Sequence, residues 1–99
     1  MKFVQTISYT TTKIDELRAL SDRWNAQNPQ APGLVSVKVL QDRDRENAFM
    51  IVAEFESYDV AMENSARPET DAFAKEMAAL VDGPPTFANY DVIDEDSGS

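Results

Sequence analysis

Hydrophobic and polar residues alternate along four short stretches of the chain. Such alternation, with many β-branched and aromatic side chains, is typical of strands that bury one face. The pattern predicts strands over residues 2–9, 34–41, 49–55 and 86–93.

Between the first two strands, apolar residues recur at the spacing of a helix. These residues are Ile14, Leu17, Leu20 and Trp24. They predict an amphipathic helix over residues 13–26. Thr12, followed three residues later by Asp15, resembles a capping box with Asp in place of Glu, so we expect Thr12 to cap this helix.

A second helical region follows the third strand. Ser57 has the side chain of an N-cap and predicts a helix over residues 58–66. Pro68 interrupts this helix, because the residue before a proline disfavours helical angles. A further helix is predicted to begin at Glu69 or Thr70. Its apolar positions are Phe73, Met77 and Leu80.

Loop-forming residues separate these elements. Residues 28–33 (NPQAPG) and 82–85 (DGPP) combine Gly and Pro, which end regular structure. Residues 42–47 (DRDREN) are short and fully polar, as in a hairpin that joins antiparallel strands. The order β-α-β-β-α(α)-β predicts an α+β, ferredoxin-like fold, in which one four-stranded antiparallel sheet carries helices on one face.

The third strand predicts how the other face of that sheet is used. One side of this strand would carry Phe49, Ile51, Ala53 and Phe55, and the other Met50 and Val52. A strand that is apolar on both sides is typically covered on both. The helices cover one face, so we expect a homodimer through the open face. The alternative is a monomer with an exposed patch at Met50 and Val52.

Length and charge favour one acidic domain. The 99 residues suffice for a single core, predicted over residues 1–93, with a disordered acidic tail at 94–99. The net charge is −9. Residues 1–50 hold seven basic and six acidic side chains, whereas residues 51–99 hold two basic and twelve acidic. The acidic excess therefore lies in the second half and the tail.

The same composition excludes several functions. The chain has no His and no Cys, which excludes a Ser-His triad, thiolate chemistry and the commonest haem and zinc ligands. Its acidity argues against nucleic-acid and membrane partners. We see no signal peptide or transmembrane stretch, so we expect a cytoplasmic location. Nucleotide-binding and metal-binding motifs are also missing, and we expect neither cofactor nor metal.

The segment Phe55 to Thr70 (FESYDVAMENSARPET), followed by Phe73, resembles the strand-to-helix segment of the antibiotic-biosynthesis-monooxygenase-like small proteins. These belong to the dimeric α+β barrel superfamily, and the resemblance extends over nearly the whole chain. It implies oxygenation of a small aromatic or quinol compound without a cofactor. Relatives often have His where this chain has Asn64. The missing His argues against the haem-degrading, peroxidase and chlorite-dismutase activities of this fold.

Two amides lie among apolar neighbours in the predicted strands. Gln5 lies between Phe3 and Ile7, where a hydrophobic residue is expected. A buried amide needs a partner, so Gln5 lines a ligand pocket or is satisfied by the backbone or a second subunit. Asn89, between Phe87 and Tyr90, invites the same two interpretations.

Four residues of the predicted helices are further pocket candidates. Trp24 is either a core residue or a wall that stacks on a planar ligand. Tyr58 and Asn64 would edge one cavity between helices and sheet, although Tyr58 fits a surface position equally well. Arg67 binds a substrate carboxylate or phenolate, or it pairs with an acidic neighbour.

No catalytic residue can be assigned from these patterns. Asp42, Asp44 and Glu46 have metal-like spacing but lack the glycine and terminal glutamate of a calcium loop, so we interpret them as a solvated hairpin tip. Two functions remain open. One is a cofactor-free monooxygenase with a small aromatic or quinol substrate, and the other is a non-catalytic dimeric module that binds a small apolar ligand or assembles. Isomerase- or lactone-type chemistry of the same fold is a third.

Overall fold

The computed structural model describes residues 1–27 and 32–96 and confirms the predicted order of elements. The elements are β1 (Phe3–Thr10), α1 (Ile14–Gln27), β2 (Leu34–Gln41), β3 (Ala48–Phe55), α2 (Tyr58–Ser65), α3 (Pro68–Ala78) and β4 (Thr86–Asp91). Residues 28–31 of the predicted first loop lie outside the described residues. No helix within the described ranges is long and apolar enough to cross a membrane.

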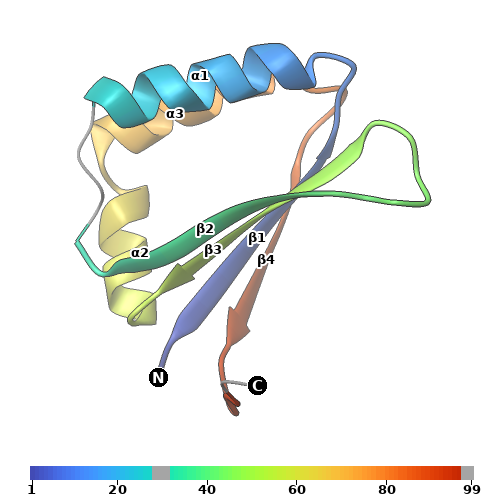
Figure 1. The fold of residues 1–99 in the computed structure, drawn as a ribbon. Helices are drawn as coiled ribbons and strands as arrows, with labels where there is room; N and C mark the ends of the chain where they lie inside the picture. The colour runs from blue at the N-terminus through green and yellow to red at the C-terminus, as the bar shows by residue number, and fades with distance from the viewer. Residues whose placement is uncertain (28–31, 97–99) are drawn as a thin grey trace.

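The four strands form one antiparallel sheet in the order β2-β3-β1-β4. All three helices lie on one side of this sheet, and the opposite side carries none (Figure 1). The central strand β1 pairs with both β3 and β4, so that Gln5 lies opposite Ala53 on one side and Asn89 on the other. The predicted ferredoxin-like α+β fold is confirmed.

The core lies between the helices and the side of β1 that carries Phe3 and Tyr9. It has two clusters, at opposite ends of the sheet. The first contains Tyr9, Leu17, Leu20 and Met77, and the second contains Phe3, Phe55 and Ala61. Gln5 lies between these clusters along β1, because side chains on one face follow one another at every second residue.

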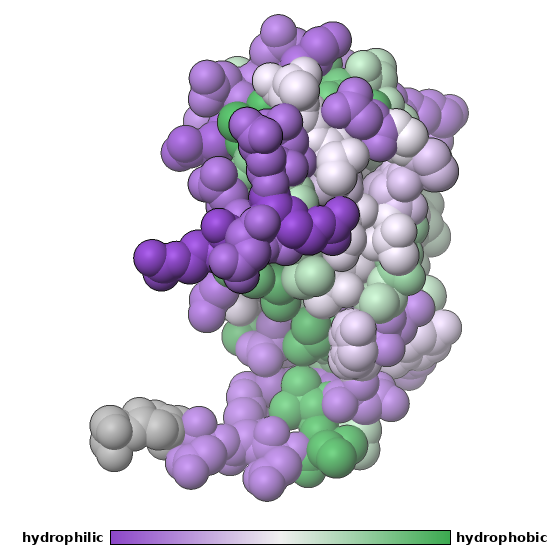
Figure 2. All heavy atoms as spheres, turned by 90° about the vertical axis from the view of Figure 1, so that its right-hand side faces the viewer, coloured by the Kyte–Doolittle hydropathy of each residue, from purple (hydrophilic) through white to green (hydrophobic). Residues whose placement is uncertain are grey.

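The helix-free side of the sheet carries the other residues of each strand. On β3 these include Met50 and Val52, which are half-buried, and on β2 they include Leu40, which is exposed. Figure 2 views the molecule from the right-hand side of Figure 1, where pale and green residues lie between more hydrophilic ones. No other part of the described chain covers this face in the way that the helices cover the opposite one (Figure 1).

Strand β2 is more exposed than its alternating pattern predicts. Val35, Val37 and Val39 were expected on a half-buried face but are 43%, 52% and 53% exposed. The reason is the position of β2 at the edge of the sheet. In addition, the register with β3 shifts between Leu34 and Ser36, so that Val35 occupies a bulge.

The first helix begins one residue later than predicted, and a different threonine supports its start. The carbonyl of Lys13 accepts from Leu17 N–H at 3.1 Å, which puts Lys13 rather than Thr12 at the N-cap. Thr11 is 1% exposed, and its hydroxyl accepts from Lys13 N–H at 2.9 Å and donates to the carbonyl of Leu80 at 2.6 Å. Thr12 is exposed. The capping-box prediction missed Thr11 because its partner Leu80 is remote in sequence.

Helix α3 begins at Pro68 itself, earlier than the predicted start at Glu69 or Thr70. Ser57 caps α2 as predicted, since its hydroxyl accepts from Val60 N–H at 3.2 Å. Helix α2 ends at Ser65, and Arg67, with φ −71° and ψ 136°, occupies the N-cap of α3. A proline is favourable at the first helical position because that N–H would have no helical partner.

The final strand ends at Asp91, two residues earlier than predicted. Beyond it, Val92 N–H donates to the carbonyl of Lys2 at 2.9 Å, and the ammonium of Lys2 lies 3.1 Å from a carboxylate oxygen of Glu95. Ile93 is 87% exposed. Residues 94–96 form no helix or strand, and 97–99 of the predicted tail lie outside the described residues. The division into a domain at 1–93 and a disordered tail stays a prediction.

The chain approaches itself closely where it enters β2. Gly33 has φ +80°, which other residues rarely adopt, and a Cβ at this position would overlap the side chain of Val60 on α2. The carbonyl of Gly33 also accepts from Glu56 N–H at 2.8 Å. Glycine is therefore required both by backbone angle and by space.

Candidate functional site

The corner between α2 and α3 holds a buried polar atom without a partner. Asn64 lies one helical turn after Ala61, which is buried, so its side chain is on the inward side of α2. Its amide oxygen Oδ1 is buried and has no hydrogen-bond partner among the described residues. Such an atom is costly to bury, and its presence favours a ligand or water as the missing donor.

Two more of the predicted residues meet at the same corner through Glu69. The Nε of Arg67 lies 3.3 Å from a carboxylate oxygen of Glu69. The indole N–H of Trp24 donates to the main-chain carbonyl of Glu69 at 3.3 Å. Trp24 also contacts the ring of Phe73, with centroids 5.3 Å apart. The structure thus brings Trp24, Asn64 and Arg67 together around the start of α3.

This geometry bears on the roles proposed for Trp24 and Arg67. Arg67 forms an ion pair with a neighbouring acid, as in the structural alternative considered for it. Trp24 is partly buried and connects α1 to α3 through both its N–H and its ring. Both side chains therefore build the corner, where the amide oxygen of Asn64 has no hydrogen-bond partner among the described residues.

The two candidate amides of the sheet bond to each other. Gln5 and Asn89 are cross-strand neighbours on β1 and β4, and Gln5 Nε2 donates to Asn89 Oδ1 at 3.3 Å. The amide of Gln5 therefore has a partner that none of the sequence-based interpretations included, because the pairing of β1 with β4 joins residues 84 apart in the chain. The pair forms a polar spot on the helix-facing side of the sheet, between the two core clusters.

Tyr58 lies apart from the other candidates. Its ring packs edge-on against Phe3, with centroids 5.2 Å apart and the planes at 83°. The residue is 52% exposed and starts α2, whereas Asn64 lies near the end of that helix. Along α2, Tyr58 and Asn64 lie six residues apart, about 9 Å at the usual helical rise, and the idea that both edge one cavity stays a prediction.

Sequence reasoning missed Thr70. This residue lies in the first turn of α3, and its hydroxyl is buried without a hydrogen-bond partner among the described residues. The signal that could have found it is the helical stripe of α3, because Thr70 precedes Phe73 by three positions and the buried Met77 by seven. It is the polar member of an otherwise apolar stripe.

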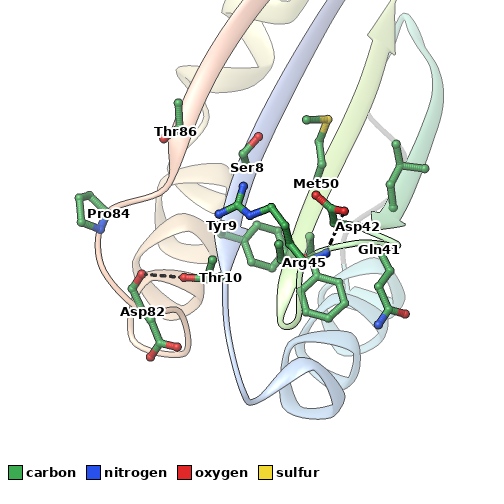
Figure 3. Close-up of a pocket in the computed structure, with 13 residues that line it drawn as sticks. Ser8, Tyr9, Thr10, Gln41, Asp42, Arg45, Met50, Asp82, Pro84 and Thr86 are labelled. Atoms are coloured by element: carbon green, nitrogen blue, oxygen red, sulfur yellow. Dashed lines mark hydrogen bonds between the residues drawn. The ribbon is translucent and has the colours of Figure 1, made fainter.

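A cavity of about 430 Å³ lies elsewhere, at the hairpin end of the sheet (Figure 3). Its lining includes Ser8, Met50 and Thr86 from three strands, with Arg45 extending from the β2–β3 hairpin. The lining includes none of the six candidate residues. The carboxylate of Asp42 accepts from the N–H groups of Asp44 and Arg45 at 2.8 and 3.2 Å, so this acid shapes the hairpin tip.

Two side chains have shifted pKa values, and both lie outside the α2–α3 corner. Burial raises the pKa of the Tyr9 hydroxyl above its usual value, because the apolar surroundings disfavour the phenolate. The hydrogen bond and charge of Glu95 raise the pKa of Lys2. The described residues contain no group of three or more acidic side chains placed to hold a metal ion.

No protein-family model matches the sequence, and a search of curated proteins gives no match. Solved structures do match. A mutant of SnoaB, a cofactor-independent oxygenase from Streptomyces nogalater, is 18% identical over 98% of both chains, with a TM-score of 0.83. Rv0793 from Mycobacterium tuberculosis is 16% identical over 98% of this chain and 100% of that one, with a TM-score of 0.79.

A third structure, of an antibiotic biosynthesis monooxygenase, is 15% identical over 95% of this chain and 100% of that one, with a TM-score of 0.74. At these identities the comparison shows a shared fold. The resemblance predicted from the sequence is therefore confirmed at that level, and the chain has the ferredoxin-like fold of the antibiotic-biosynthesis-monooxygenase-like proteins.

Proposed function

We propose that this protein is a cofactor-free oxygenase that binds a small aromatic or quinol compound between the sheet and its helices. The observation that carries the proposal is the buried amide oxygen of Asn64 on the inward side of α2, which has no hydrogen-bond partner within the described part of the chain. It occurs in a fold that is shared, over nearly the full length of both chains, with a cofactor-independent oxygenase. Fold alone does not specify a reaction, so the argument depends on Asn64.

The chemistry suits a chain without histidine or cysteine. An electron-rich phenol can itself reduce O₂, so no external reductant is needed. With 1-naphthol, for example, one oxygen atom enters the ring to give 1,4-naphthoquinone and the other leaves as water. The protein contributes a site that excludes water and hydrogen bonds that hold the phenol in one orientation.

Asn64 supplies such a hydrogen bond. Its Oδ1 is an acceptor, so it would orient a ligand through a protonated hydroxyl group. The Trp24–Phe73 contact forms an aromatic wall at the same corner. Gln5 and Asn89 add two amides on the facing sheet, where their mutual hydrogen bond at 3.3 Å leaves other lone pairs and protons for a ligand.

We propose further that two copies associate through the helix-free face of the sheet. Met50, Val52 and Leu40 give this face an apolar centre, and the helices of the same chain lie on the opposite side. An antiparallel sheet can face water on one side, but an apolar centre favours a second sheet packed against it. The cavity at the hairpin end opens on this face and would be covered in such a dimer.

The test measures O₂ uptake and quinone formation with 1-naphthol and related phenols, using ¹⁸O₂ to follow the oxygen atoms. We expect one labelled atom in the quinone and one in water. Asn64→Ala should reduce the rate by at least about tenfold, as one lost hydrogen bond of about 1.4 kcal/mol predicts. Asn25→Ala, at an exposed asparagine of α1, is the matched control.

The same measurements address the non-catalytic alternative. If the naphthols bind, raise the melting temperature and yet cause no O₂ uptake, the protein is a ligand-binding module instead. If Asn64→Ala oxidises the phenols as fast as the wild type, the site does not lie at the α2–α3 corner.

A further inference from the structure

We infer that Thr70 is a second ligand-binding group beside Asn64, and that the pair selects aromatic ligands with two oxygen substituents over those with one. The inference rests on the proposed function and names the substrate class of the same site. It starts from two buried polar atoms, Asn64 Oδ1 and Thr70 Oγ1, which have no hydrogen-bond partner in the described chain.

The two residues lie on inward sides of consecutive helices. Asn64 follows the buried Ala61 by one turn of α2, and Thr70 shares the stripe of α3 with Phe73 and the buried Met77. Both positions thus lie on the sheet-facing sides of their helices, near the corner where the two helices join.

Hydrogen bonds of the backbone fix this corner. Arg67 N–H donates to the carbonyl of Asn64 at 3.2 Å, and Thr70 N–H donates to the carbonyl of Arg67 at 3.1 Å. Two successive turns therefore connect the two residues. Trp24 holds the same turn from α1 through the carbonyl of Glu69, the residue before Thr70. Both polar groups are thus carried by hydrogen-bonded backbone, which favours the fixed placement that a binding site requires.

The hydrogen-bonding capacities of the two groups define the ligand. The amide oxygen of Asn64 only accepts, so it needs a protonated hydroxyl on the ligand. The hydroxyl of Thr70 donates or accepts, so it can engage a second hydroxyl or a carbonyl. A ligand with one oxygen leaves one of these buried groups unsatisfied, so it binds more weakly than a ligand that engages both.

The stability of the unliganded protein provides an independent check. A buried hydroxyl without a partner destabilises the folded state, and valine has nearly the same shape without the polar atom. If Thr70 serves a ligand, Thr70→Val should melt at the same temperature as the wild type or higher. If Thr70 instead has a structural role through its hydroxyl, the variant should melt at a lower temperature.

The binding experiment compares 1-naphthol with 1,3-, 1,5- and 1,8-dihydroxynaphthalene under anaerobic conditions, by calorimetry and thermal shift. We expect wild-type protein to bind at least one diol about tenfold more tightly than 1-naphthol, as one additional satisfied hydrogen bond predicts. Thr70→Val should bind 1-naphthol as before and lose the preference for the diol. Thr70→Ser, which keeps the hydroxyl, should restore it, and the exposed Thr12→Val should behave as wild type.

Each result has a defined meaning. A diol preference that survives in Thr70→Val, or a fall in melting temperature of that variant, overturns the role of Thr70 while leaving oxygenation intact. Diol binding that depends on Thr70 but gives no O₂ uptake in air supports the inference and refutes the oxygenase. Wild-type protein that binds none of the four naphthalenes overturns the ligand class and with it both proposals.

Discussion

The indole N–H of Trp24 donates to the main-chain carbonyl of Glu69 at 3.3 Å and thereby joins α1 to the first turn of α3. The same ring contacts Phe73, four residues further along α3. One side chain thus contacts α3 at two points, one of which is the residue before Thr70. The contacts of Trp24 therefore bear both on the stability of the fold and on the position of the candidate site.

Replacing Trp24 should separate its two contributions. Trp24→Phe keeps a ring against Phe73 but loses the hydrogen bond, so we expect a loss of about 1 kcal/mol in unfolding free energy. Trp24→Ala also removes the ring and should cost about 3 kcal/mol. Urea unfolding measures both values. Equal losses for the two variants would contradict the role given to the ring.

Thr11 and Thr12 form a matched pair for testing how the start of α1 is held. Thr11→Val removes the hydrogen bonds to Leu80 and Lys13, and we expect a loss of about 2–3 kcal/mol in unfolding free energy. Thr12→Val changes an exposed side chain and should stay within about 0.5 kcal/mol. A larger loss of stability at Thr12 than at Thr11 would instead support the capping box that the sequence predicts.

Gly33 and Gly83 both have positive φ, but a Cβ would meet Val60 at Gly33 and open space at Gly83. Gly83→Ala should therefore cost about 1 kcal/mol for backbone strain alone. Gly33→Ala should cost about 2–4 kcal/mol, because steric overlap adds to the strain. In a Val60→Ala background the additional loss at Gly33 should shrink, which a double-mutant cycle measures. An unchanged loss would mean that Val60 is not the obstacle.

Alkaline pH should destabilise the protein through Tyr9. Its pKa is raised in the folded state, so above the usual value of 10.0 the unfolded chain loses this proton more readily than the folded one. Unfolding free energy is then unaffected below that pH and falls as pH rises above it. Lys2, whose pKa is also raised, acts in the same direction from 10.5 upward. In Tyr9→Phe the unfolding free energy should fall less steeply above pH 10.0 than in the wild type. Urea unfolding at a series of pH values measures this difference.

If two copies associate through the helix-free face, a charge placed on that face should dissociate the dimer, and a charge on the opposite face should not. Val52→Asp places a charge at the centre of the helix-free side, and sedimentation equilibrium at micromolar concentration should find the variant monomeric. Val37→Asp, on the helix-facing side of β2, should remain dimeric. Wild-type protein that sediments as a monomer at these concentrations would refute the association itself.

Much of the fold could be predicted because local patterns and tertiary packing agree. Alternation identified all four strands, and the stripe of α1 and the cap at Ser57 located two helix starts to within a residue. Predictions failed where a distant element decided the outcome. Thr11 is bound by Leu80, and the valines of β2 are exposed because the sheet order puts β2 at an edge.

The candidate site could be predicted only in part, for the same reason. Asn64 and Trp24 belong to helices whose inward sides follow from periodicity. The partner of Gln5 depends on the pairing of β1 with β4, which no local pattern contains. Thr70 was missed because a threonine in the first turn of a helix is unremarkable until its hydroxyl is found buried.

The two ends of the described chain lie side by side, where Val92 donates to Lys2 and Lys2 pairs with Glu95 (Figure 1). The 42–47 hairpin lies at the other end of β1, close to Thr11. A circular permutant that joins the termini by a short linker and opens the chain within 42–47 should therefore keep every strand pair of the sheet. Fusion partners attached at either end of the described chain would likewise sit together, at the end of the molecule away from that hairpin.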